Sequence, residues 1–489
     1  MRFRVVYAEN WRNDVKRIGY IILISAICYD LFLKNTAQAD YVLWIPYQVL
    51  MEGEITVHPG GTLTLRSAFG NCRLPVKETI FWEIPSLQKR FQRLQLKNQG
   101  EGSENLLQVA RWALKQGLLE EYYQMLERVL EEDAQHLLAG KLLRKRQQLT
   151  GQLKDPSSEI EELQKIIGHK MKVRRSPHFI LLHDTEDQRV DRRIQLLETF
   201  YESFLMFFWS QGYPLQEPAL RLRVVLFDQF HDFQTFARKV RPGLENSAGF
   251  WDTRYNVTVF SKYGTQGHLK ELLEAARRTK QQVAENTGER TRLRRILRAL
   301  NVAIATVEEK ASVEVVFHEM THQMAGSTGL LPRKVRIPDW VHEGLATFFE
   351  SPADAGWSAI GAVNKTRLNR YRQLANHIDP IQRKYSSVDF VITNQIFLTA
   401  STPLDQSLAY GQSWALTHFL INRYFDSLME YYEILSKLPP DTLLHEERLR
   451  ACFNRVFENG KGQLDSQWRA YMQRLTTDLD RLLKENKNH

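Results

Sequence analysis

The sequence has few cysteines and a low mean hydropathy. Three cysteines in 489 residues exclude a scaffold built on disulfides. A mean hydropathy of −0.41 excludes a membrane protein with many spanning helices. The net charge is only +9, which permits an anionic partner without demanding one. Basic residues do not alternate with aromatic ones over any long stretch, so we expect no nucleic-acid partner. With 43% apolar residues, the chain is long enough for two to four globular domains.

The first residues have the pattern of an export signal. Residues 1–17 carry five basic side chains, Ile18–Tyr29 is uncharged, and Ala37-Gln38-Ala39 precedes Asp40. A basic segment, a short apolar segment and small residues before the cut are typical of a secretory signal. We therefore expect residues 1–39 to be a signal peptide and the protein to be secreted or in the cell envelope, periplasmic or extracellular. Two alternatives remain, an uncleaved membrane anchor and a buried N-terminal helix.

Two small modules are predicted next. In residues 40–90, Ile55–Val57 and Leu63–Leu65 flank Pro59-Gly60-Gly61, which predicts a hairpin in a small β module that serves for packing. Residues 91–170 have helical spacing and resemble one or two tetratricopeptide-like (TPR-like) hairpins. One such unit cannot bury its own apolar face, so we expect it to pack on its neighbours. A peptide-binding groove is the less favoured alternative. Without the signal, Cys72 and Cys452 remain, and they either pair or stay buried and free.

Residues 171–489 are predicted to form an α+β domain whose C-terminal part is mainly helical. Apolar runs at His178–Asp184, Leu220–Phe227 and Val257–Ser261 predict strands. A charged helical insertion is expected at 268–300. Its segment 270–298 has a net charge of +5, which favours a solvated helical pair. The alternative is a surface that docks on an anionic envelope polymer.

The chemistry is concentrated in one helical segment, His318-Glu319-Met320-Thr321-His322. Residues four apart lie on one face of a helix, so both imidazoles can bind one Zn²⁺. Glu319 is rotated by about 100° from His318 and can face a water on the metal. A third ligand is available 21 residues after His322, where Glu343 lies on a second predicted helix. Two histidines and one glutamate form a catalytic zinc set. His342 competes with Glu343, but only one of the two can face the metal.

The segment H-E-M-T-H-Q, followed by W-x-x-E-G-L-A-x-F-F-E, resembles the peptidase MA-like (gluzincin) zinc metallopeptidases. More narrowly, it is similar to an exported bacterial branch of that group whose function is largely uncharacterised. The resemblance covers about 176–430 and implies a zincin-like fold. It also implies that His318, His322 and Glu343 are the zinc ligands and that Glu319 is the general base.

The same resemblance implies further roles. Tyr410, in Tyr410-Gly411-Gln412-Ser413, corresponds to a tyrosine at the start of a later helix that stabilises an oxyanion. The stretch Gly249–Trp251, leading into Asn256–Ser261, resembles the edge strand that lines the cleft and could hold a substrate backbone. The chain departs from the pattern at Thr347, where these enzymes often have an aspartate that orients the first histidine. Glu314 or Glu350 is the expected replacement.

These observations predict a secreted zinc metallopeptidase that cleaves peptide bonds in a peptide or protein substrate, with Glu319 as the base. Two other functions remain open. One is an inactive metal-binding scaffold that interacts through its helical regions. The other is a zinc amidase that acts on cell-wall peptides, for which the basic segment 270–298 would suit the polymer. A membrane partner is expected only if the N-terminal segment stays uncleaved.

Overall fold

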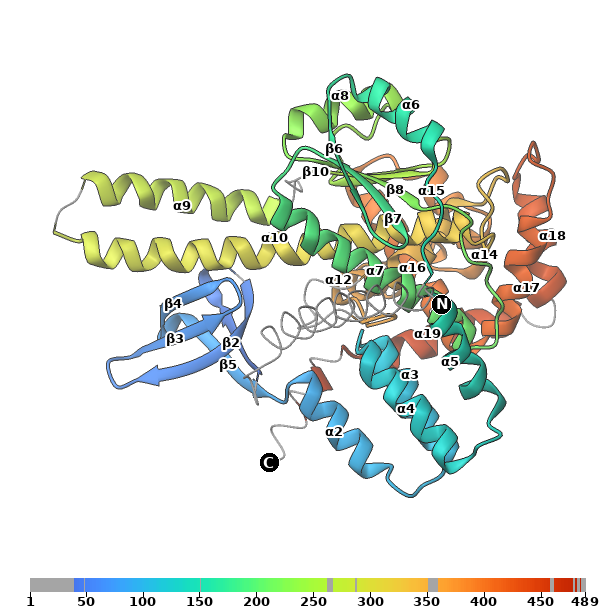
Figure 1. Cartoon of the computed structure of the whole chain (residues 1–489), viewed down its shortest axis with the longest axis horizontal. Coiled ribbons are helices and arrows are strands. Elements are labelled where there is room, and N and C mark those ends of the chain that lie inside the picture. The colour runs from blue at the N-terminus through green and yellow to red at the C-terminus, as the bar shows by residue number, and fades with distance from the viewer. Residues whose placement is uncertain are drawn as a thin grey trace, which may run out of the picture.

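The computed structural model describes residues 39–47, 49–149, 151–261, 267–285, 288–350, 359–457, 461–477, 480–481 and 484. Its architecture is α+β, as predicted, with two five-stranded sheets and a mainly helical C-terminal part (Figure 1). Most of the predicted signal peptide, residues 1–38, lies outside the described residues. Within the described part, no helix combines the length and the apolar character needed to cross a membrane.

The first sheet is the predicted β module. Its strands are β1 (Ala39–Trp44), β2 (Val49–His58), β3 (Thr62–Ser67), β4 (Gly70–Pro75) and β5 (Thr79–Ile84). They are antiparallel in the order β4-β3-β2-β1-β5. The predicted hairpin is confirmed, since Ile55 pairs with Leu65 and Val57 with Leu63. Gly61, at the turn, has a φ of 68°, which a residue with a side chain rarely adopts.

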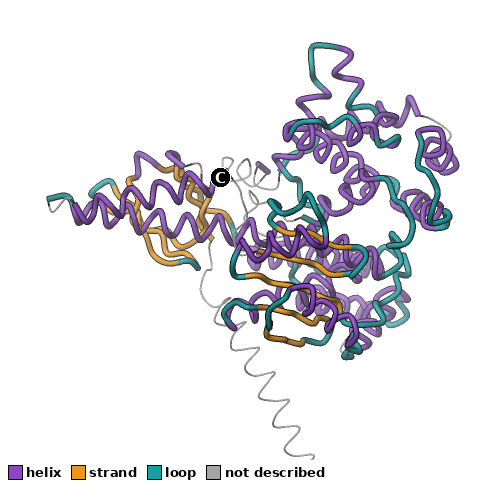
Figure 2. The backbone as a smooth tube through the Cα atoms, turned by 90° about the horizontal axis from the view of Figure 1, so that it is seen from above, coloured by secondary structure: helices purple, strands orange, loops and turns teal. Residues whose placement is uncertain are grey.

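This module packs on a long helical hairpin formed by α9 (Gly267–Glu285) and α10 (Arg290–Ser327). Figures 1 and 2 show the hairpin projecting from the main body with the sheet along its side. The prediction of a solvated insertion at 268–300 is therefore wrong for one face, because that face is buried against the sheet. The residues that join the two are Val42, Met51, Leu63 and Leu74 from the sheet and Leu272, Ala299, Leu300 and Ala303 from the helices.

The helices α2 (Leu87–Lys97), α3 (Ser103–Lys115), α4 (Leu119–Glu132), α5 (Leu137–Leu149) and α6 (Ser157–Ile167) follow the module. α3 and α4 pack closely against each other, and α3 and α5 contact α7 (Asp187–Ser210). Their buried residues belong to the same apolar cluster as the C-terminal helices. The prediction that this region packs on its neighbours is therefore confirmed.

The second sheet contains β6 (Lys172–Arg175), β7 (Phe179–His183), β8 (Leu222–Phe227), β9 (Gly249–Asp252) and β10 (Val257–Ser261) in the order β6-β7-β8-β10-β9. β7, β8 and β10 are parallel, whereas β6 and β9 are antiparallel edge strands. β7, β8 and β10 are buried on both faces, as expected for parallel strands, whereas the edge strand β6 is exposed. One face contacts α6 and α8 (Phe230–Val240), and the other contacts α7 and α10.

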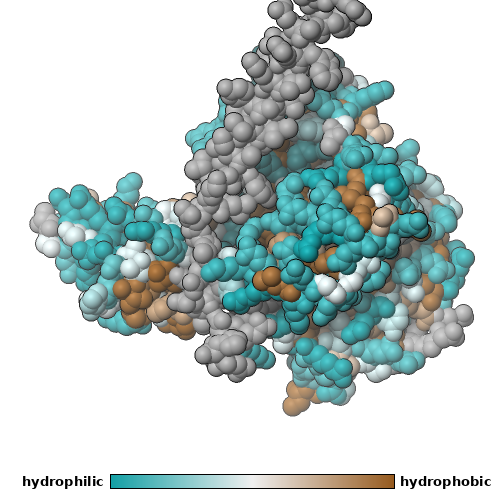
Figure 3. Space-filling view, turned by 60° about the horizontal axis from the view of Figure 1, so that its bottom comes forward, coloured by the Kyte–Doolittle hydropathy of each residue, from teal (hydrophilic) through white to brown (hydrophobic). Residues whose placement is uncertain are grey.

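The C-terminal part contains α11 (Asp339–Phe349), α12 (Lys365–Ala375), α13 (Pro380–Lys384), α14 (Val388–Ile392), α15 (Gln395–Leu398), α16 (Pro403–Arg423), α17 (Phe425–Ser436), α18 (Glu446–Phe457) and α19 (Lys461–Arg474). α11 packs against both α10 and α16, and its Phe348 and Phe349 contact aromatic residues of α7. Cys72 and Cys452 are both buried and unpaired, which decides between the two alternatives left open by the sequence. The surface seen in Figure 3 is mainly hydrophilic, with small apolar patches.

Candidate metal centre

Both histidines of the motif lie near the C-terminal end of α10. The helix is continuous over 38 residues, because no glycine or proline interrupts the sequence between Arg290 and Ala325. His318 and His322 are one turn apart, and their side chains are only 14% and 10% exposed. The predicted insertion 268–300 therefore ends inside the helix that carries the motif.

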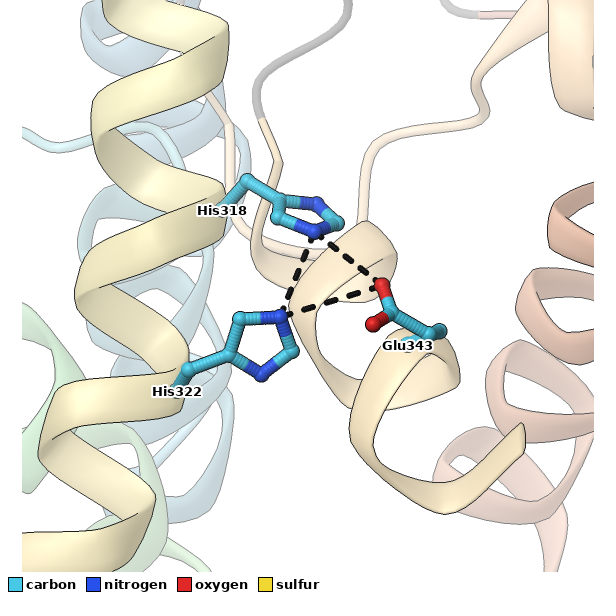
Figure 4. A group of neighbouring side chains, drawn as sticks. All are labelled: His318, His322 and Glu343. Carbon is cyan, nitrogen blue, oxygen red and sulfur yellow. Dashed lines mark hydrogen bonds and ion pairs between the residues drawn. The ribbon is translucent and has the colours of Figure 1, made fainter. Parts of the chain in front are cut away.

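His318, His322 and Glu343 converge on one point (Figure 4). His318 Nε2 lies 3.3 Å from His322 Nε2 and 3.2 Å from Glu343 Oε2. His322 Nε2 lies 3.7 Å from the same oxygen. Ligands at 2.0–2.1 Å from a tetrahedral metal are about 3.3–3.4 Å apart, which is close to this spacing. Glu343 Oε2 is buried, and both imidazole nitrogens lie within 3.7 Å of it, as neighbouring ligand atoms would.

A close crossing of two helices places Glu343 at this point. The next residue, Gly344, lies where α11 meets α16, and a Cβ atom there would be 2.1 Å from Thr417 Oγ1 and 2.9 Å from the carbonyl oxygen of Ser413. Only glycine fits such a crossing. The glycine that follows the glutamate in the sequence thus allows α11 to bring its carboxylate toward α10.

Glu350 supplies the carboxylate that orients His318. Its side chain is 2% exposed, and its Oε2 accepts a hydrogen bond of 3.2 Å from His318 Nδ1. This contact fixes the tautomer that leaves Nε2 free to bind a metal. Arg367 and Asn364 donate to the same carboxylate at 3.2 Å. Thr347 does not orient His318, because its hydroxyl donates to backbone carbonyls of α11.

Burial and pairing act in opposite directions on the pKa of Glu350. Burial raises the pKa of Glu350, but the charge of Arg367 and the hydrogen bond with His318 outweigh it and lower that pKa to about 2. Glu314, the second candidate from the sequence, also acts on Glu350 and raises the pKa of Arg367. Glu350 is therefore the residue in contact with His318, and Glu314 lies behind it.

The pKa values of the three candidate ligand residues are shifted in different directions. Burial lowers the pKa of His318, but the hydrogen bonds with Glu343 and Glu350 dominate and raise it well above its usual value. Burial lowers the pKa of His322 to about 3. For Glu343, burial is outweighed by the three surrounding histidines, which lower its pKa to about 2. The shifts thus favour a positive charge beside the ionised carboxylate of Glu343, a charge balance that a divalent metal also satisfies.

Glu319 is not one of the three converging residues, although the charges of His318 and Glu343 both act on its carboxyl group. Burial raises the pKa of its carboxyl group to about 7, although the charge of His318 opposes the shift. The backbone N–H of Trp251 donates to it. A carboxyl group with a pKa near neutrality can both accept and release a proton at physiological pH.

Strand β9 lies at the edge of the second sheet, as predicted, whereas β10, which covers the second half of the predicted edge strand, pairs with β8 and β9 and lies inside the sheet. The ring of Trp251 stacks on His322, with 6.1 Å between the centroids and 14° between the planes. Its indole N–H donates to Asn256 Oδ1 at 3.0 Å. A Cβ atom at Gly326 would lie 2.8 Å from the indole ring, so this glycine allows α10 to approach the strand.

Tyr410 also reaches the site, but from a different position than predicted. It lies two turns inside α16, not at its start. The nearby charge of Glu343, burial and the charge of Glu319 raise the pKa of its hydroxyl group, which hydrogen-bonds to Glu343. Its ring centroid is 6.2 Å from that of His318, and the guanidinium group of Arg367 lies over the ring at 5.2 Å.

His342, the competing ligand, is not part of the group. Its ring lies beside His322 at 5.9 Å and beside Trp251 at 6.5 Å. Its Nδ1 is buried without a hydrogen-bond partner among the described residues. Burial lowers its pKa, so it is a neutral neighbour of the site.

Two parts of the site, and a separate group of possible ligands elsewhere, were not predicted from the sequence. Arg367 and Asn364 belong to no motif and reach Glu350 only through the fold. The stacking of Trp251 on His322 joins residues 71 positions apart. A second group, His169, Asp184 and Asp232, has its ligand atoms within 4.8 Å of one another. It is more exposed, and nothing else points to a metal there.

The fold and the site thus define an α+β chain with a buried group of two histidines and one glutamate from an H-E-x-x-H helix. The family DUF1570, described as a protein of unknown function, matches residues 312–441. The matched part contains His318, Glu319, His322, Glu343 and Tyr410, and neither sheet. No curated protein matches the sequence.

Proposed function

We propose that this chain is a zinc-dependent metallopeptidase of the gluzincin type with a zincin-like fold. The observation that carries the proposal is the convergence of His318 Nε2, His322 Nε2 and Glu343 Oε2 within 3.2–3.7 Å of one another. Nitrogen and carboxylate ligands in this number are those of catalytic zinc sites. Glu350 completes the set by holding the first histidine in the tautomer that binds a metal.

Zn²⁺, when bound, would polarise the substrate carbonyl and lower the pKa of a water molecule. Glu319, whose buried carboxyl group has a raised pKa in the absence of a metal, would accept the proton from the attacking water and pass it to the leaving amine. Tyr410 keeps its proton, since its pKa is raised, and can donate a hydrogen bond to the oxygen that becomes negative in the transition state. Trp251 shields one side of His322 and donates its backbone N–H to Glu319.

Peptide bonds in a peptide or protein are the proposed substrate, because a base and a hydrogen-bond donor lie beside the same ligand group. The segment 1–39 supports export to the cell envelope or the exterior. An anionic envelope polymer is the proposed partner of the basic segment 270–298, whose charged side chains lie on the faces of α9 and α10 away from the β module.

The test begins with the zinc content of the purified chain, measured by elemental analysis. We expect about one zinc per chain in the wild type, and loss of zinc in His322→Ala and Glu343→Ala. His342→Ala is the matched control, because it removes a neighbouring imidazole that is outside the ligand group. Absence of zinc from the reconstituted wild type, or equal loss in the control, contradicts the proposal.

Hydrolysis is tested next with casein and with purified cell wall. Glu319→Gln should keep zinc and lose hydrolysis, because the amide has almost the same shape and cannot accept the proton. Cleavage of wall peptides alone would favour the amidase. Zinc binding without cleavage of either substrate would favour the inactive scaffold.

A further inference from the structure

A second candidate site shares no residue with the ligand group. It is a groove of about 760 Å³, open on one side, between the α2–α3 region and the C-terminal helices. One wall comes from α2 and the end of α3, and the other from residues 359–363, α16, α19 and Arg481. The walls are joined where the Ile360 N–H donates to the carbonyl oxygen of Lys115 at 2.6 Å.

The groove is cationic over an apolar floor. Its basic residues are Arg90, Arg93, Lys97, Lys115 and Arg481, and none of its described lining residues is acidic. The floor contains Leu94, Trp112, Ile360, Val363 and Leu475. Arg90 lies over the Trp112 ring at 5.4 Å, so the aromatic ring holds one cation at the apolar surface. A ligand that contacts both the basic residues and the apolar floor of the groove must carry negative charge and apolar groups.

The positive charges are spread along the groove and do not converge. Arg90, Arg93 and Lys97 are three and four residues apart on α2, so they follow one face over about 10.5 Å. A single phosphate or carboxylate cannot contact all of them. An extended peptide places alternate side chains about 6.6–6.8 Å apart on one side, so successive acidic residues can meet successive cations.

The remaining polar groups of the groove suit a peptide backbone. Gln116 is 9% exposed, and its Oε1 has no hydrogen-bond partner among the described residues. It can accept from a ligand N–H. The Asn422 side-chain oxygen and the Tyr471 hydroxyl oxygen also line the groove and can accept hydrogen bonds, whereas their donors are engaged with His418. A lipid or a fatty acid offers one polar end and no N–H groups for Gln116.

The groove wall formed by residues 359–363 is held in place by contacts with α11 and α16. His418 donates from Nε2 to the carbonyl oxygen of Gly361 at 3.2 Å, and the Tyr471 hydroxyl lies 2.9 Å from its Nδ1. Gly361 has a φ of 67°, and a Cβ atom there would lie 2.6 Å from the Phe348 ring. This wall is thus fixed to α11 without any ligand, so the groove is preformed, as small binding sites usually are.

We propose that this groove binds an extended acidic peptide segment, with acidic side chains on the basic row of α2 and apolar side chains on the floor around Trp112. The proposal does not depend on the proposed function, because the groove shares no residue with the ligand group. A peptide bound there would be a partner, or a distant part of a substrate.

The test measures binding of a fluorescein-labelled eight-residue peptide, in which Glu alternates with Leu, to the full chain by fluorescence anisotropy. The same peptide with Gln in place of Glu tests the need for charge. The peptide is recovered afterwards and its mass is measured, so that hydrolysis is not mistaken for weak binding. Binding is repeated after zinc removal, where an unchanged affinity separates the groove from the metal centre.

Charge reversal on the groove is compared with charge reversal elsewhere. Arg93→Glu with Lys97→Glu changes two exposed residues of α2, and Lys141→Glu with Arg144→Glu changes two exposed residues of α5 by the same total charge. We expect at least a tenfold loss of affinity in the first variant and less than twofold in the second, with circular dichroism spectra unchanged. Equal losses, or equal binding of the Gln peptide, would overturn the proposal.

Two competitors test the choice of ligand class. Neither inorganic phosphate at millimolar concentration nor phosphatidylglycerol vesicles should displace the acidic peptide at physiological salt. Displacement by phosphate alone would identify a site for a simple anion, and displacement by vesicles would identify a lipid site. Either result would overturn the peptide proposal.

Discussion

Variants of the ion pair between Glu350 and Arg367 should change folding stability and zinc affinity by different amounts. Glu350→Gln removes a charge that is 2% exposed and leaves the guanidinium group of Arg367, whose side chain is 19% exposed, without its closest anion. Removing one partner of a buried pair costs about 3–5 kcal/mol. We expect about 3 kcal/mol here, because Glu314 remains as a second anion near Arg367.

The double variant Glu350→Gln with Arg367→Met should recover most of that loss, since no buried charge is then unpaired. Zinc affinity should behave differently. The Gln amide oxygen can still accept from His318 Nδ1, but the lost charge makes the imidazole a weaker ligand. We therefore expect about a tenfold loss, the smaller end of the range for such partners, in both the single and the double variant.

Stability is measured by urea unfolding in the presence of a chelator, so that bound zinc does not contribute. Zinc affinity is measured by competition with a chelating dye. Glu433→Gln is the control, because its ion pair with Lys437 is exposed and should contribute less than about 1 kcal/mol. If Arg367→Met fails to restore stability, the pair is not the cause of the loss. If it restores zinc affinity, Glu350 does not act through His318.

Two further predictions concern packing and pH. Gly344→Ala should destabilise the fold by about 1–3 kcal/mol and weaken zinc binding, because its methyl group would meet Thr417 Oγ1 at 2.1 Å. Gly60→Ala, which meets nothing within 4 Å, is the control in the same unfolding and zinc assays, and equal effects would refute the helix-crossing argument. Burial lowers the pKa of His418 from 6.5 to about 4, so the unfolded state binds more protons between these values and stability falls as pH drops through that window, by on the order of 3 kcal/mol. His418→Gln should flatten the pH dependence of urea unfolding over pH 4–6.5, and an unchanged slope would show that His418 is not the group responsible.

The candidate ligands could be predicted because helical spacing fixes them locally. His318 and His322 share a face on any straight helix, and a glutamate on the next helix is the natural third ligand. The start of α16 was also readable, since Thr402 and Asp405 form a capping box and Pro403 is in the first turn. That signal places Tyr410 inside the helix and corrects the prediction that it begins one.

The groups around the ligands could not be predicted in the same way. Arg367 meets Glu350 because α12 returns to α11 through the tertiary fold, and no spacing in the sequence encodes that return. The sequence offered Glu314 and Glu350 as equal candidates for the partner of His318. Only the packing of α10, α11 and α12 places one in contact with the histidine and the other behind it.

The length of α10 explains why the segment 268–300 is not solvated on all sides, contrary to the prediction from the sequence. Its length of about 57 Å lets it belong to two apolar clusters, with Val302 and Ala303 against the β module and Val316 and Phe317 in the main core. A charged stretch with a narrow apolar face looks solvated when it is considered alone. The sheet that covers that face is formed by residues that lie more than 180 positions earlier in the chain.

The continuity of α10 also assigns a role to the β module. A helix bends sharply only at a proline, a glycine, a π-bulge or an inserted group, and the sequence from Val302 to His318 contains neither proline nor glycine. The module contacts α10 from Ala299 to Lys310, whose Nζ donates to the carbonyl oxygen of Leu50, and Lys310 lies about 12 Å along the helix from the first histidine. Because the two are joined by a continuous helix, the module cannot shift without bending α10 or breaking its own contact. We infer that the sheet braces the helix that presents His318 and His322, and that it does not act as a separate moving domain.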